Sequence, residues 1–305
     1  MDKKQAPKSE AEELGSFLEE LQKEHQVRDI AGWETGFSGL SGLLNGILPG
    51  LYFVTGLPAC GKTAFAKQLL DQVILHNSVA GIFFSFAEKK KDLRIRTLAR
   101  LSGLENREIR RGSAFLLHWY GVPKGSVTHV DRLSPSWEKL KRSAEDARSW
   151  WARTYLVECG RETKPQEIAE QILAVKELQN ARPVLIVIDD CQRLAGNDQP
   201  LQDRLAMIAD QLQGIAIALE VPILAVWPVF RKEGAGFDRL PQFWAETVPA
   251  DVVLVLESDP ERTKQLTEPN QAILLHVVKN RGGEKGKLAF DFLPAFSKFV
   301  EVPKP

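Results

Sequence analysis

The sequence is poor in cysteine, lacks long apolar runs and carries no excess of charge. Its three cysteines are too few and too scattered for a disulfide framework or a zinc site, which indicates a reducing, cytoplasmic setting. No apolar run approaches the ~20 residues of a membrane-spanning helix, so we expect no membrane partner. The first residues are followed by no apolar core, so we expect no signal peptide there.

The overall charge says little about partners. The 40 basic and 40 acidic residues cancel, so no overall field attracts nucleic acid, although a local basic surface is compatible with this balance. A hydrophobic content of 44% and a charged content of 26% are ordinary for a globular protein. With 305 residues and no internal repeat, the chain has room for one large α/β domain with appendages or for two small domains.

What the sequence does contain is a complete phosphate-binding loop, Gly-Leu-Pro-Ala-Cys-Gly-Lys-Thr, at residues 56–63. An apolar, strand-like stretch at 51–55 precedes this loop, and a helical pattern at 63–76 follows it. Strand, loop and helix in this order are the setting in which such a loop binds a nucleotide. The position of the loop therefore favours nucleotide binding over a chance glycine-rich turn.

The residue types in the loop suit phosphate. Gly56 and Gly61 let the backbone curl so that its N–H groups point into one concavity, and the following helix presents the positive end of its dipole there. Lys62 is expected to reach the β- and γ-phosphates, and the Thr63 hydroxyl to bind Mg²⁺. We therefore predict that ATP and Mg²⁺ bind at Gly56, Leu57, Pro58, Ala59, Cys60, Gly61, Lys62 and Thr63.

A second part of such a site is expected at the end of a buried strand. Residues 184–188 are all apolar, and Asp189 and Asp190 follow them. A carboxylate at this point can hold the coordination shell of Mg²⁺. We therefore predict that Asp189 binds the metal together with Thr63.

Strand and helix patterns alternate through most of the chain, which predicts an α/β fold with a mostly parallel central sheet and helices on both faces. Helical patterns lie at 63–76, 91–102, 136–150, 165–178 and 201–219. Strand patterns lie at 51–55, 81–86, 154–158, 184–189, 221–227, 251–256, 272–278 and 287–292. A Gly-rich turn joins the last two strands into a C-terminal β-hairpin.

The N-terminal segment is expected to stand apart from this domain. Apolar residues at helical spacing predict one amphipathic helix over 9–24, behind a tail at 1–8. The chain is thus divided into a tail and helix at 1–30 and an ATP-binding domain at 31–305.

In this order the motifs resemble the RecA-like motor domain of the DnaB-type replicative helicases, over roughly residues 34–301. The resemblance is carried by segments 35–40, 48–50, 83–86, 110–112, 185–189 with Gln192, 219–223, 250–253, and 279–283 with Gly286. It implies a RecA-like P-loop NTPase that hydrolyses ATP and assembles into a homo-oligomeric ring, expected to be a hexamer. It also makes single-stranded DNA a candidate ligand, in replication or repair. We expect no counterpart of the family's N-terminal domain before the motor, and the 9–24 helix takes the place of the helix by which such subunits attach to their neighbours.

The segment Lys279-Asn280-Arg281-Gly282-Gly283 resembles the family's Lys-x-Arg hairpin. The resemblance implies that Lys279 and Arg281 cross a subunit boundary and reach the γ-phosphate of a neighbour. Cations fixed on a tight turn can stabilise charge on a transferred phosphoryl group, as an arginine finger does.

The residue that activates water has two candidates. The position that corresponds to the family's catalytic glutamate is Ala87, and Glu88 follows one residue later. A one-residue slip on a strand turns the side chain to the opposite face, so Glu88 can act only if the strand has bulged or already turned. Asp190 is the alternative, since many phosphate-loop ATPases use an acid beside the metal-binding aspartate.

Two more segments differ from the family or carry extra charge. Trp227 and Pro228 stand where the family has a polar pair that senses the γ-phosphate, and the corresponding DNA-channel loop is 231–239. Residues 89–111 hold nine basic and three acidic residues, interleaved with Leu93, Leu98 and Leu101. A solvated helix face over an apolar stripe is favoured there over a nucleic-acid surface.

Two functions from different classes follow. The first is an ATP-hydrolysing motor on single-stranded DNA. The second is an ATP-binding module that hydrolyses slowly and uses nucleotide-controlled assembly to recruit or regulate a partner. The phosphate loop and the Lys-x-Arg hairpin favour the motor, whereas Ala87 and Pro228 favour the module.

Overall fold

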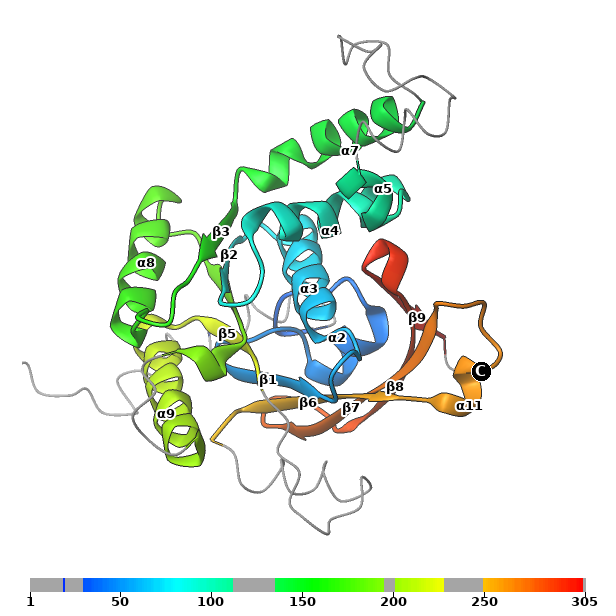
Figure 1. Cartoon of the computed structure of the whole chain (residues 1–305). Helices are drawn as coiled ribbons and strands as arrows, with labels where there is room; N and C mark the ends of the chain where they lie inside the picture. The colour runs from blue at the N-terminus through cyan, green and yellow to red at the C-terminus, as the bar shows by residue number, and fades with distance from the viewer. Residues whose placement is uncertain (1–18, 20–29, 112–134, 195–200, 228–248, 304–305) are drawn as a thin grey trace, which may run out of the picture.

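The computed structural model describes residues 19, 30–111, 135–194, 201–227 and 249–303. Within these residues, one nine-stranded sheet has the order β3-β2-β4-β5-β1-β6-β7-β8-β9 (Figure 1). The strands are β1 (Gly50–Gly56), β2 (Ala80–Ser85), β3 (Thr154–Glu158), β4 (Val184–Asp189), β5 (Pro222–Val226), β6 (Val252–Ser258), β7 (Gln271–Asn280), β8 (Gly286–Leu293) and β9 (Lys298–Val302).

The sheet is parallel from β3 to β6 and antiparallel from β6 to β9. Strands β1, β2, β4 and β5 are buried at every position, which explains their unbroken apolar sequences. In β8, by contrast, Leu288, Phe290 and Phe292 alternate with more exposed residues, because that strand buries one face more deeply than the other.

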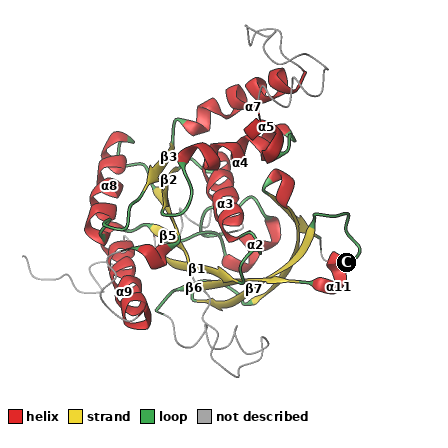
Figure 2. Cartoon of the chain, viewed as in Figure 1, coloured by secondary structure: helices red, strands yellow, loops and turns green. Residues whose placement is uncertain are grey.

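Helices cover both faces of the sheet. They are α2 (Ser38–Leu44), α3 (Lys62–His76), α4 (Lys90–Ser102), α5 (Asn106–Arg111), α7 (Pro135–Trp151), α8 (Pro165–Leu178), α9 (Leu201–Leu219) and α11 (Pro260–Thr263). Figure 2 shows α8 and α9 on one side of the sheet and α2, α3 and α4 on the other. Each side has its own apolar core: Phe65 and Leu69 of α3 belong to one, and Ile172 of α8 and Leu212 of α9 to the other.

The predicted α/β sheet is confirmed, with every predicted strand present within two residues of its expected bounds. Helices α2, α5 and α11 were not predicted. The predicted C-terminal hairpin is present as β7 and β8, and the sheet then continues into the unpredicted strand β9. The 9–24 helix and the boundary at residue 30 lie almost wholly outside the described residues. None of the described helices is both long and apolar enough to cross a membrane.

Candidate functional site

The phosphate loop runs from the end of β1 into the start of α3, and two of its positions require glycine. Gly56 has φ 149°, and a Cβ there would lie 2.3 Å from the carbonyl oxygen of Leu256. Gly61 has φ 83°, and a Cβ there would lie 2.9 Å from ring atoms of Phe292 and Phe299. Both glycines therefore serve the left-handed backbone and the close packing of the loop.

The loop also holds one residue with a side chain in the left-handed region. Ala59 has φ 68°, a conformation that costs about 1–2 kcal/mol for a residue with a Cβ. Cys60 beside it is buried in the α3-side core, and this burial raises the pKa of its thiol, although the Lys62 ammonium acts in the opposite direction. Cys60 thus anchors the loop to the core on the α3 side of the sheet.

Lys62 folds back across the loop. Its Nζ donates to the carbonyl oxygens of Gly56, at 2.7 Å, and of Leu57, at 2.9 Å. These contacts hold the ammonium against the backbone of the loop. The amine is thereby held where phosphate oxygens of a nucleotide would replace the two carbonyls as acceptors.

Thr63 and Asp189 meet as the sequence predicts. The Thr63 hydroxyl donates to Oδ1 of Asp189 at 3.2 Å, although 126 residues separate the two. The other carboxylate oxygen, Oδ2, is buried and has no hydrogen-bond partner among the residues that the structure describes. A hydroxyl beside a carboxylate oxygen with no donor is a donor set that suits Mg²⁺, so the residues present fit this ion.

The surroundings of Asp189 disfavour its charge. Burial raises the pKa of this carboxyl to about 6, and the charges of Glu88 and Asp190 add to that effect. The Thr63 hydrogen bond and the Arg96 guanidinium oppose it. A cation bound at the site would stabilise the ionised form of this buried carboxyl.

Glu88 does not lie on strand β2. The strand ends at Ser85, whose hydroxyl donates to the carbonyl oxygen of Glu88 at 2.7 Å and accepts from the Glu88 N–H at 3.0 Å. The chain has therefore already turned at Glu88, the condition under which this residue can face the metal site. Both carboxylate oxygens of Glu88 accept from Arg96 of α4, and Arg96 also donates to the hydroxyl of Ser297 at 3.0 Å.

Asp190 has different surroundings. It is left-handed, with φ 66°, and its carboxylate pairs with Arg193 three residues later. The Arg193 guanidinium in turn donates to the carbonyl oxygen of Phe86, which fixes this turn against the end of β2. The two candidate bases are thus each held by an arginine, but only Glu88 is held by a residue from another element.

Lys279 and Arg281 lie at the opposite end of the sheet from the phosphate loop. Arg281 donates to Oδ1 of Asp251 at 2.9 Å, and Asp251 precedes β6. Since Gly56 pairs with Leu256, Arg281 is separated from the loop by five residues of strand, or about 17 Å. Neither cation can therefore serve the loop of its own chain in this conformation. The pKa of Lys279 is lowered, because burial and the charges of Arg281 and Lys285 outweigh the opposite effect of Asp251.

The basic stretch 89–111 is only partly a solvated face. Arg96 and Arg100 turn inward, to Glu88 and to Asp71, so the prediction of a purely solvated face is wrong for these two. The apolar stripe also differs from the predicted one, because Leu93 is buried but Leu101 is 42% exposed.

At the predicted sensor position, Trp227 is buried and stacks on Phe53, with ring centroids 4.0 Å apart. Pro228, the channel loop 231–239 and the segment after it lie outside the described residues.

The structure contains a buried ionic cluster that the sequence did not predict. Lys67 and Asp71 of α3 pair one helical turn apart, and Arg100 of α4 joins the same carboxylate. The i, i+4 spacing of Lys67 and Asp71 was a visible signal, but such pairs usually lie on a solvated face. Only the packing of α4 on α3 buries this one.

Taken together, the doubly covered parallel sheet and the loop at the end of its central strand define a RecA-like P-loop NTPase domain. Within that class the chain belongs to the family of DnaB-like helicase C-terminal domains, whose model matches residues 32–301.

Individual proteins similar to this chain are replicative helicases. The chain is 23% identical to the replicative DNA helicase DnaC of Bacillus subtilis and 24% identical to the replicative DNA helicase DnaB of Geobacillus stearothermophilus. Each match covers 90% of this chain but 58% of the relative, so the chain spans little more than half the length of these helicases.

Solved structures share the fold. One solved ATPase domain superposes with a TM-score of 0.75 at 18% identity, covering 98% of this chain and all of that one. A DnaB-like replicative helicase, studied with its primase, superposes with a TM-score of 0.69 at 18% identity, covering 99% of this chain and 69% of its own.

Proposed function

We propose that this protein binds and hydrolyses ATP as a ring-forming motor that acts on single-stranded DNA. The observation that carries the proposal is the hydrogen bond from Thr63 to Oδ1 of Asp189, beside a complete phosphate loop, while Oδ2 of the same carboxylate has no partner among the described residues. The family and the replicative helicases among its relatives support the same function.

The residues divide the work as follows. Lys62 and the loop N–H groups bind the phosphates, while Thr63 and Asp189 hold Mg²⁺. The bound ion would neutralise charge on the phosphate oxygens. Glu88 orients the attacking water and accepts its proton, and this requires that its carboxylate exchange at least one Arg96 contact for water. Lys279 and Arg281 act on the site of a neighbouring subunit, because their own loop is out of reach.

A second function is favoured by two observations. Glu88 is held at both oxygens by Arg96, and Trp227 stacks within the sheet where the resemblance places a polar sensor. Both suit an ATP-binding module that hydrolyses slowly and assembles under nucleotide control to recruit a partner.

Steady-state ATP hydrolysis, with and without single-stranded DNA, separates the two functions, with Lys62→Ala as the blank. A turnover near ~1 s⁻¹ that rises with DNA is expected of the motor. Turnover equal to that of the blank, while the wild type still binds ATP, would rule out the motor in favour of the assembly module. Sedimentation with and without ATP then reports the ring.

A further inference from the structure

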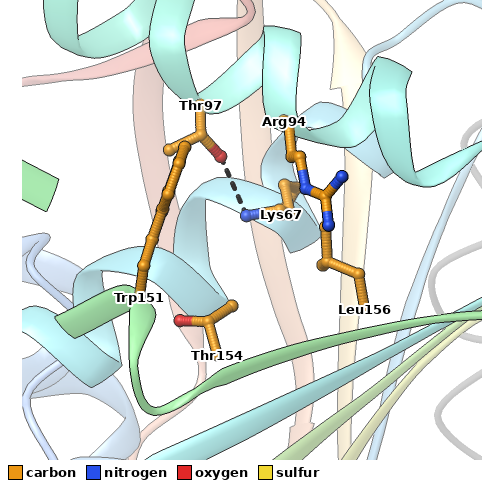
Figure 3. A pocket seen from close by; sticks show the side chains of 6 residues that line it. All are labelled: Lys67, Arg94, Thr97, Trp151, Thr154 and Leu156. Atoms are coloured by element: carbon orange, nitrogen blue, oxygen red, sulfur yellow. Dashed lines mark hydrogen bonds between the residues drawn. The ribbon is translucent and has the colours of Figure 1, made fainter. Parts of the chain in front are cut away.

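A cavity of about 140 Å³ lies away from the phosphate loop, between α3, α4, the end of α7 and the edge strand β3 (Figure 3). It is lined by Lys67, Arg94, Thr97, Trp151, Thr154 and Leu156. No residue of the phosphate loop reaches it. The space is several times the ~30 Å³ that one water occupies in the liquid, so it can hold a small molecule.

The lining is cationic. It contains two cations and two hydroxyls but no carboxylate. Figure 3 shows the Trp151 ring on one side of the cavity, Arg94 on the other, and the Lys67 amine between them. Arg94 forms no ion pair with the described residues, and the nearby acids Glu88 and Asp92 are paired with Arg96 and Arg110.

The buried residues that contact Lys67 also carry more positive than negative charge. Lys67 is 1% exposed, and its Nζ donates to the Thr97 hydroxyl at 2.9 Å and to Asp71. Asp71 also accepts from Arg100, so one buried carboxylate serves two buried cations. A buried cluster with a net positive charge is costly unless a counter-charge accompanies it. Burial itself lowers the pKa of Lys67, while Asp71 raises it.

We propose that this cavity is a binding site for a small oxyanion, a phosphate or a short carboxylate. Its oxygens would accept from Arg94 and from the third N–H of the Lys67 ammonium, which has two acceptors in the structure. Trp151 and Leu156 would exclude water from the contact. The anion supplies the negative charge that the Lys67–Asp71–Arg100 cluster lacks. The site is independent of the nucleotide site, so its test does not depend on ATP hydrolysis.

The test is calorimetric titration of the full chain with inorganic phosphate and with malonate, at constant ionic strength in chloride. All proteins carry Lys62→Ala, so that phosphate binding at the loop is suppressed. Arg94→Gln is expected to weaken binding about ten-fold or more, since it removes a hydrogen bond from a charged donor. Arg111→Gln removes the same charge from an exposed position outside the cavity and is expected to change the affinity by less than about two-fold.

Lys67→Met is expected to abolish binding, while Asp71 remains paired with Arg100. Circular dichroism checks that this buried variant folds. If it does not, Arg94→Gln, at an exposed side chain, still decides the matter. Binding of either oxyanion that Arg94→Gln weakens and Arg111→Gln leaves nearly unchanged supports the site, and the preferred probe tells phosphate from carboxylate. No binding to the parent protein, or equal weakening by Arg94→Gln and Arg111→Gln, would overturn it.

Discussion

At the scale of single residues, Glu88 and Asp190 follow neighbouring buried strands but are held in different ways. The hydrogen bond from Ser85 turns the chain at Glu88, and the Glu88 carboxylate is close enough to Asp189 for its charge to raise the pKa of that group. Asp190, by contrast, forms a local pair with Arg193. Glu88→Gln is therefore expected to lower the ATP turnover about 100-fold or more, with ATP affinity changed by less than about three-fold.

Asp190→Asn is the matched control, and single-turnover hydrolysis with an ATP titration measures both variants. Its turnover should stay within about three-fold of the wild type. A large loss in Asp190→Asn with a small one in Glu88→Gln would transfer the role of base to Asp190.

Gly61 offers a test of the loop backbone. Gly61→Ala forces a Cβ against Phe292 and Phe299 at φ 83°, so a loss of about 2 kcal/mol or more in the free energy of unfolding is expected. Gly214→Ala is the control, because that exposed position of α9 has open space around it. It should gain about 0.5–1 kcal/mol, as Ala replaces Gly in a helix. Urea unfolding reports both, and a neutral Gly61→Ala would contradict this account of the loop.

Single residues also mark where the sequence could and could not predict the site. The phosphate loop and Asp189 follow from local spacing, and their contact follows from the order of strand and helix. The ion pairs of Arg96 and Arg100 cannot be read from local spacing, because their partners Glu88 and Asp71 lie 8 and 29 residues away along the chain. Only the packing of α4 against α3 decides which cations of a basic stretch meet acids.

At the scale of elements, the strands with unbroken apolar runs were predictable and the weakly patterned elements were not. Helix α2, Ser-Gly-Leu-Ser-Gly-Leu-Leu, has two glycines and low helix propensity, and the burial of Leu40 and Leu44 holds it in place. Strand β9 buries Phe299 alone among its five residues and depends on pairing with β8. Tertiary contacts, which a local pattern does not contain, create both elements.

The antiparallel strands predict a response to acid. Nε2 of His276 of β7 lies 2.8 Å from a carboxylate oxygen of Glu257 of β6. Burial lowers the pKa of His276, the charge of Glu257 raises it and that of Lys287 lowers it. The net effect is a pKa below the ordinary value of 6.5. The folded chain thus binds fewer protons than the unfolded chain, so this contribution to stability is complete above pH 6.5 and is lost as the pH falls.

His276→Gln should therefore lose less stability than the wild type between pH 7.5 and 5.5. Urea midpoints at the two pH values measure this difference. Equal losses in the two proteins would mean that His276 does not titrate in the expected sense.

At the scale of the whole molecule, the phosphate loop and the Lys-x-Arg turn lie at opposite ends of one sheet. A ring of identical chains would bring one end of each sheet to the other end of the next. Lys62→Ala and Arg281→Ala are each expected to be inactive alone, since each removes one half of every composite site.

An equal mixture of the two variants should regain turnover. Random assembly places an intact loop beside an intact Arg281 at about one interface in four. Steady-state hydrolysis after mixing and reassembly measures the gain. A mixture no more active than its parts would argue that Arg281 works within its own chain or not at all.

Strand β9 has a mechanical consequence. Gln68 of α3 grips it by two hydrogen bonds to the backbone of Phe299, the Phe299 ring lies under Gly61, and Arg96 links Ser297 to Glu88. Tension applied to this edge strand would therefore first distort the phosphate loop and the contact of Arg96 with Glu88, before the parallel strands separate. Strand β9 thus couples the edge of the sheet mechanically to the phosphate loop.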